Sequence, residues 1–141
     1  MEGTRLYVFT VMQILAVGVL FWFLITWPTP WNIQRYVGTT LCVAGAIGIA
    51  TARYQLGRSF SITARAKYLV TRGMYSKIRN PIYVCGWLMV AGFLMVMQRP
   101  VLWILLGAIV VGQTIRARRE ARVLESAFGD EYREYRRKTW F

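Results

Sequence analysis

Four apolar blocks without a charged residue limit what this chain can fold into. The first, at residues 6–27, would extend roughly 33 Å as a helix that rises about 1.5 Å per residue, enough to cross the hydrocarbon core of a bilayer. The others, at residues 37–52, 82–98 and 101–115, are short for a span. Because the chain is 56 % hydrophobic but has only 141 residues, a soluble fold could not bury this surface. The sequence predicts a single all-α integral membrane domain, residues 1–141, with about four transmembrane helices.

The first apolar block could be mistaken for a secretion signal. Its apolar core is too long for one, and the sequence that follows, "ITWPTPW", lacks the small-x-small pattern of a cleavage site. We expect this block to be a retained membrane anchor.

The distribution of charge predicts how the spans are oriented. Residues 53–80 carry several Lys and Arg and no acidic residue, and the tail at 116–141 is also rich in basic residues. The linker at 28–36 contains only Arg35 as a charged residue. By the positive-inside rule, the amino terminus, the 53–80 segment and the tail should face the cytoplasm.

A net charge of +12 could also indicate nucleic-acid binding, but basic loops beside membrane spans are ordinary, so we expect no nucleic-acid partner.

The last helix should continue beyond the membrane. From Val101 onward no proline interrupts the chain, and Gly129 is the next strong helix stop, so we expect this helix to run to Phe128. Four residues recur on one face of the extension and form an apolar stripe: Ala117, Ala121, Leu124 and Phe128. The stripe needs a partner surface. We expect the 53–80 segment and the helical tail to enclose a pocket at the cytoplasmic membrane surface.

The supply of reactive side chains excludes several classes of function. There is no histidine, and the two cysteines, Cys42 and Cys85, lie singly inside apolar blocks as small hydrophobic fillers. A metal site is therefore not expected. All acidic residues lie outside the apolar blocks, which disfavours a proton-coupled transporter, since such proteins need an ionisable residue at membrane depth.

One charged pair lies where the last helix should leave the membrane. Arg116 and Glu120 are four residues apart and share a face of that helix. Alone, they could form a surface ion pair of little consequence. Tyrosines near the same boundary, including Tyr75 and Tyr83, could likewise belong to an interfacial aromatic belt.

Two segments carry a family resemblance. "LVTRGMYSKIRNPIY" at 69–83 resembles the signature L-V-x-x-G-x-Y-x-x-x-R-H/N-P-x-Y of the isoprenylcysteine carboxyl methyltransferase family, which is related to membrane phospholipid methyltransferases. "RARREARVLESAFGDEYREY" at 116–135 resembles that family's second signature, R-x-x-x-E followed by L-x-x-x-F-G-x-x-Y-x-x-Y. The two signatures occur in order and are separated by a predicted two-span hairpin.

The resemblance implies a site for S-adenosyl-L-methionine between the basic loop and the last helix, with a lipophilic methyl acceptor arriving from the bilayer. Glu120 matches the glutamate that binds the cofactor, and Arg116 matches the arginine that faces the acceptor. Asn80 stands where many members have histidine, Ala121 follows Glu120 where many have a second glutamate, and Lys67 replaces a frequent histidine. The remaining positions that the resemblance assigns to the cofactor, together with Lys67 and Asn80, are Tyr68, Leu69, Val70, Tyr75, Pro81, Ile82 and Tyr83.

The residues themselves are compatible with this chemistry. Methyl transfer is a direct displacement in which the protein aligns the reactants and excludes water. A carboxylate or thiolate acceptor needs no strong general base. The acceptor stays open at this point between a carboxylate, a phospholipid amine and a small thiol. A basic membrane adaptor without catalytic activity is the non-enzyme alternative. The oligomeric state is also open, and the chain has no GxxxG motif.

Overall fold

The computed structural model describes residues 2–56 and 69–141, and this part of the chain is built from helices joined by turns. The predicted all-α class is confirmed. The helices are α1 (Glu2–Thr26), α2 (Ile33–Leu56), α3 (Pro81–Met97), α4 (Trp103–Phe128) and α5 (Asp130–Lys138), with single 3-10 turns at Gly73–Ser76 and Pro100–Leu102.

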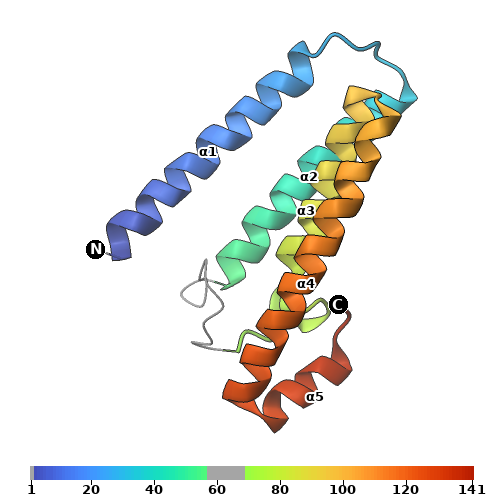
Figure 1. The fold of residues 1–141 in the computed structure, drawn as a ribbon. Coiled ribbons are helices and arrows are strands. Elements are labelled where there is room, and N and C mark those ends of the chain that lie inside the picture. The colour runs from blue at the N-terminus through green and yellow to red at the C-terminus, as the bar shows by residue number, and fades with distance from the viewer. Residues whose placement is uncertain (1, 57–68) are drawn as a thin grey trace.

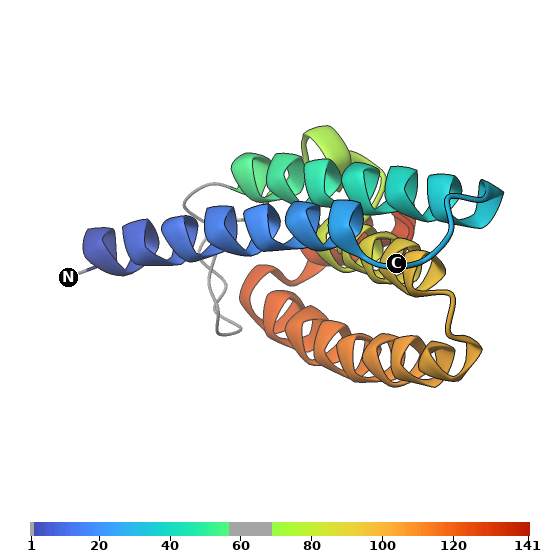
Figure 2. The same cartoon turned by 90° about the horizontal axis from the view of Figure 1, so that it is seen from above.

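Helices α1 to α4 run up and down, so the end of α2, the start of α3 and the end of α4 lie at the same end of the bundle (Figure 1). Helix α3 contacts both α2 and α4. Helix α1 stands apart from the other helices along most of its length (Figure 1 and Figure 2). Its last turns contact α3, where the ring centroids of Phe23 and Phe93 lie 5.0 Å apart.

A buried arginine fastens the last turn of α1 to α2. The side chain of Arg35 is 1 % exposed, and its guanidinium donates to the carbonyl oxygens of Leu24 at 2.9 Å, Ile25 at 3.3 Å and Thr29. The carbonyls of Leu24 and Ile25 belong to the last turn of α1, where carbonyls lack intrahelical donors and carry the negative end of the helix dipole, which favours a cation, whereas Thr29 lies in the linker. The predicted linker at 28–36 was too long, because α2 already begins at Ile33 and includes Arg35.

Helices α2 and α3 approach each other closely because glycines face the contact. A Cβ at Gly38 would lie 2.6 Å from the carbonyl oxygen of Gly92. A Cβ at Gly45 would lie 2.7 Å from Cys85 O and from Met89 N, and these are backbone atoms of α3. Small residues allow helix backbones to approach closely. Such packing is important in membranes, where the hydrophobic effect does not drive helices together.

The predicted end of the last helix at Phe128 is confirmed, and the residues that start and stop the helices have local causes. Pro81 is the first residue of α3, where a missing N–H costs no hydrogen bond. Pro100 opens the 3-10 turn before α4, and α4 ends at Phe128. Gly129, with φ of +53°, then turns the chain back into α5. Helix α4 contacts α3 and α5, so α5 is a partner of α4 that the sequence did not indicate.

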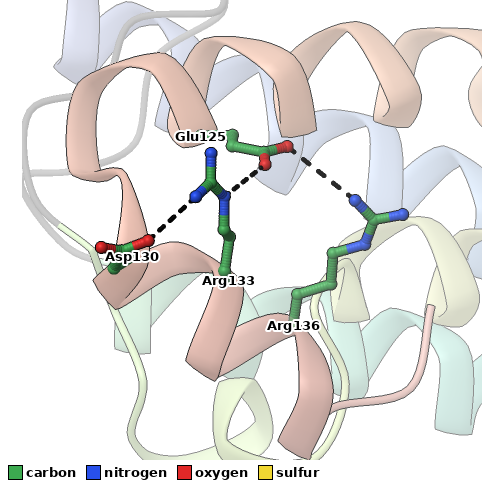
Figure 3. A network of polar contacts seen from close by, with 4 residues as sticks. All are labelled: Glu125, Asp130, Arg133 and Arg136. Carbon is green, nitrogen blue, oxygen red and sulfur yellow. Dashed lines mark hydrogen bonds and ion pairs between the residues drawn. The ribbon is translucent and has the colours of Figure 1, made fainter.

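Ion pairs hold α5 against the end of α4 (Figure 3). Arg133 Nε lies 3.0 Å from Glu125 Oε1, and the same guanidinium lies 2.9 Å from Asp130 Oδ1. Arg136 lies 3.9 Å from the second oxygen of Glu125. These groups are exposed, so each pair contributes little alone, and the network mainly sets the direction of α5.

The surface of the helices indicates a membrane environment. Two helical stretches, Ile33–Leu56 and Pro100–Phe128, are long and apolar enough to cross a bilayer, and Thr10–Thr26 and Pro81–Met97 are shorter apolar helices. Large apolar side chains are exposed along α1 and α4, far beyond the patches that a soluble monomer shows. They include Met12, Leu15, Val19, Trp22, Ile104, Leu105 and Val111.

Candidate functional site

The first part of the candidate site is the turn at Gly73–Ser76, which follows the segment outside the described residues. Gly73 has φ of +63°, a conformation that glycine adopts without strain. The amide of Met74 donates to Oε1 of Gln55 at 2.7 Å, so the last turn of α2 holds this turn in place. Sequence reasoning missed Gln55, because a polar residue at a helix end gives no signal of its tertiary partner.

Replacing Gly73 with alanine should loosen this turn. The left-handed conformation costs a residue with a Cβ about 1–2 kcal/mol, and the new Cβ would meet the amide group of Gln55. We expect the Met74 amide to exchange with solvent roughly 5-fold faster or more, measured by hydrogen–deuterium exchange. Gly112→Ala is the control, since nothing lies within 4 Å of a Cβ there. Unchanged exchange at Met74 would show that the turn does not depend on glycine.

The second part of the candidate site is a carboxylate held by two helices. Glu120 Oε1 accepts a hydrogen bond from the hydroxyl of Tyr83 at 2.8 Å and from Arg116 Nε at 3.0 Å. Tyr83 comes from the first turn of α3, whereas Arg116 and Glu120 come from the middle of α4. The side chain of Glu120 is 25 % exposed and that of Arg116 is 52 % exposed. The pair is therefore more than an i, i+4 surface contact, because a tyrosine from another helix completes it.

A pair of tyrosines connects the turn to the tail. Tyr75 is 6 % exposed and Tyr135 is 9 % exposed, and the Tyr135 hydroxyl donates to the carbonyl oxygen of Tyr75 at 2.6 Å. Burial, followed by the proximity of Tyr135 and of the Glu120 carboxylate, raises the pKa of the Tyr75 hydroxyl above its ordinary value. Burial, followed by Tyr132, raises the pKa of Tyr135 to about 12. Both hydroxyls are therefore neutral at physiological pH. Tyr75 and Tyr135 belong to a buried cluster rather than an interfacial belt.

The Asn-Pro step is fixed by the end of the chain. The side-chain amide of Asn80 donates to the carbonyl oxygen of Phe141 at 3.0 Å, and its backbone amide donates to the same atom at 3.0 Å. Pro81 is fully buried at the start of α3.

The structure thus brings Tyr75, Asn80, Pro81, Tyr83, Arg116 and Glu120 to one end of the bundle, around the start of α3. Leu69, Val70 and Ile82 are half-buried nearby in the chain. Lys67 and Tyr68, together with the rest of residues 57–68 of the basic 53–80 segment, lie outside the described residues. Within the residues that are described, no group of three or more His, Cys, Asp or Glu side chains could hold a metal ion.

The first signature, at 69–83, and all but the last four residues of the second, at 116–135, fall inside a match to a known family. The family model described as phospholipid methyltransferase matches residues 33–131, more than two thirds of the chain. The chain belongs to the phospholipid methyltransferase family. This family is part of the isoprenylcysteine carboxyl methyltransferase-like group, so the resemblance read from the sequence is confirmed. No curated protein and no solved structure matches the chain.

Family membership indicates a methyltransferase that acts on a lipid-related substrate. Together with the two helices long enough to span a bilayer, it also indicates a membrane-associated protein. The matched range begins at the first residue of α2 and ends at the second residue of α5. It therefore contains every candidate site residue, whereas α1 and the last ten residues lie outside it.

Proposed function

We propose that the protein transfers a methyl group from S-adenosyl-L-methionine to a lipophilic acceptor at the cytoplasmic face of the membrane. The observation that carries this proposal is the Glu120 carboxylate, which Tyr83 and Arg116 orient beside the turn that bears Tyr75. A mere surface ion pair would not require the third, partly buried donor from α3.

The chemistry of these residues fits the cofactor. S-adenosyl-L-methionine carries an ammonium and a ribose diol, which are donors, and a sulfonium, which is a cation. Within the described residues, both hydrogen bonds to Glu120 end on Oε1, which leaves Oε2 to accept from a ligand. The aromatic ring of Tyr75 or Tyr83 could attract the sulfonium by about 1 kcal/mol or more when it is desolvated. Leu69, Val70 and Ile82 offer half-buried apolar side chains for the adenine.

Each group in the site has a distinct task in this proposal. The cofactor supplies an electrophilic methyl group, which leaves the sulfonium as the acceptor's electron pair attacks the carbon. Glu120 binds the cofactor, and Tyr83 fixes the orientation of Glu120. Arg116, which is more exposed, positions the acceptor. The chain provides alignment rather than a strong base.

The acceptor class is the finer part of the proposal. The sequence resemblance points to an isoprenylcysteine carboxylate, whereas the description of the matched family favours the amine of a phospholipid headgroup. A small thiol is a further alternative. All of them would use the same cofactor site, but an amine acceptor would also have to lose a proton before it attacks, whereas a carboxylate or thiolate would not.

Incubation of the purified protein with methyl-labelled S-adenosyl-L-methionine tests both levels of the proposal. The acceptors to supply are an ethanolamine phospholipid, a farnesylcysteine analogue and a small thiol, each in separate detergent or vesicle assays. We expect label in a lipophilic acceptor, with the labelled one identifying the class. Label in none of these acceptors, nor in total membrane lipid, would contradict the proposed activity.

The orientation follows from the basic segments. We propose four membrane crossings, with both termini and the site in the cytoplasm, because the 53–80 segment and the tail carry most of the basic residues. Cysteines introduced at Asn32 and Thr139 should be labelled by a membrane-impermeant reagent from opposite sides of the membrane. Labelling of both from one side would refute four crossings.

A further inference from the structure

The C-terminal segment, Tyr135 to Phe141, provides the hydrogen-bond partners for the backbone of residues 75–80. The Trp140 amide donates to Lys77 O at 2.7 Å, and the Arg79 amide donates to Trp140 O at 2.9 Å. These bonds form a parallel bridge between Ile78 and Trp140. The Asn80 amide and the Tyr75 carbonyl are also bonded to this segment, at Phe141 and Tyr135 respectively.

This pairing matters because residues 77–80 lie in neither a helix nor a sheet. Buried backbone amides and carbonyls need partners, and here the C-terminal segment supplies those partners between the 3-10 turn and α3. The same segment takes the side-chain amide of Asn80, the residue expected to contact the cofactor. The ring of Phe141 also packs against Trp87 of α3, with centroids 4.8 Å apart.

Helix α5 carries the segment to this position. Tyr132 and Tyr135 form its buried face, at 3 % and 9 % exposure. Arg133 and Arg136 pair with Glu125 of α4 (Figure 3). The buried tyrosines and the ion pairs thus fix where α5 ends and where the last residues begin. The α5 residues that dock the segment, Tyr132, Arg133, Tyr135 and Arg136, all lie beyond residue 131, where the family match ends.

We propose that the C-terminal segment is the positioning element of the candidate site. It holds residues 75–80 in the conformation that presents Tyr75 and leads into α3, which carries Tyr83, and cofactor affinity depends on its docking. The part of this proposal that concerns cofactor affinity rests on the proposed function. The part that concerns the conformation of residues 75–80 does not. In this account Asn80 acts through Phe141, with its side-chain amide committed to the C-terminal segment rather than to the cofactor.

A pair of substitutions at Trp140 isolates the backbone bridge. The Trp140 side chain is 62 % exposed, so Trp140→Ala should keep the bridge, whereas Trp140→Pro removes the N–H that donates to Lys77. Thr139 has φ of −122° and ψ of 149°, which a residue before proline adopts readily, so the proline should fit the chain. Tyr135→Phe, which removes only the hydroxyl bonded to Tyr75, is the second test variant.

The measurements are amide hydrogen exchange at Arg79 and Asn80, the affinity for S-adenosylhomocysteine, and KM and kcat for the cofactor, all on the full chain in detergent. For Trp140→Pro we expect faster exchange at both amides, roughly tenfold weaker binding and a higher KM, with kcat at saturating cofactor and the thermal midpoint retained. Tyr135→Phe should shift the same quantities in the same direction by less, and Trp140→Ala should match the unaltered protein.

Two results would overturn the proposal. One is unchanged exchange at Arg79 and Asn80 in Trp140→Pro, and the other is faster exchange with unchanged cofactor affinity. If the unaltered protein binds no S-adenosylhomocysteine, the proposed function fails on its own. The exchange measurements then still decide whether the segment holds the loop.

Discussion

Substituting Glu120 with glutamine should weaken the binding of S-adenosylhomocysteine by about 10- to 100-fold. The change keeps the shape of the side chain and removes its charge, and the loss of a charged hydrogen bond to a ligand costs about 1–3 kcal/mol. The glutamine would also have to satisfy Tyr83 and Arg116, which donate to Oε1 of the carboxylate. Isothermal calorimetry in detergent measures the affinity, and the methylation rate should fall in parallel.

The neighbours of Glu120 should respond differently. Arg116→Ala should weaken cofactor binding no more than Tyr83→Phe does, since each removes one donor to Glu120, and it should in addition lower kcat, because the partner of Arg116 in the reaction is the acceptor. Tyr83→Phe should weaken cofactor binding by less than Glu120→Gln, since it removes one donor to the carboxylate and keeps the charge.

Glu134→Gln is the matched control for the loss of a carboxylate. Glu134 forms an exposed ion pair with Lys138 on α5. In the described part of the chain, no hydrogen bond or ion pair joins Glu134 to Tyr83 or Glu120. Its substitution should change neither affinity nor rate. Equally small effects of Glu120→Gln and Arg116→Ala would return that pair to the status of a surface ion pair.

Replacing Gly45 with alanine should destabilise the helical bundle by about 1–3 kcal/mol, the range that overpacking of a close contact produces. The new Cβ would lie 2.7 Å from both Cys85 O and Met89 N. Those atoms belong to the backbone of α3, so the contact can be relieved only by moving α2 and α3 apart. The expected result is a lower thermal midpoint in detergent, with reduced cofactor affinity, because the start of α3 carries Tyr83.

Gly86→Ala is the control for this prediction. It lies on α3, one residue after Cys85, and nothing lies within 4 Å of a Cβ there. Because alanine favours helix over glycine by up to about 1 kcal/mol, this variant should be as stable as the parent or slightly more stable. Equal midpoints for the two variants would show that α2 and α3 do not depend on a glycine contact.

Local features of this fold could be predicted from the sequence, because their causes lie within a few residues. Apolar blocks indicated the membrane helices, and Gly129 marked the end of α4. The spacing of Arg116 and Glu120 placed them on one face, as their 3.0 Å contact confirms. The family resemblance, now shown by the match to residues 33–131, added the candidate roles.

The tertiary contacts of the site could not be predicted in this way. The bond from Tyr83 to Glu120 joins residues 37 positions apart, and its formation depends on how α3 and α4 pack. The docking of Trp140 on residues 77–80 depends on the reversal at Gly129 and on the direction of α5. The sequence placed Arg35 in a linker, whereas it lies in α2. Its side chain can be buried there because carbonyl oxygens at the end of α1 accept its hydrogen bonds.

Direct titration of the unaltered protein with S-adenosylhomocysteine, by calorimetry in detergent, tests the central claim that the end of this bundle is a cofactor site. The account predicts saturable binding to one site per chain, which Glu120→Gln weakens and Glu134→Gln leaves unchanged. An absence of detectable heat or saturation at millimolar ligand, in protein whose thermal unfolding shows that it is folded, would contradict the account.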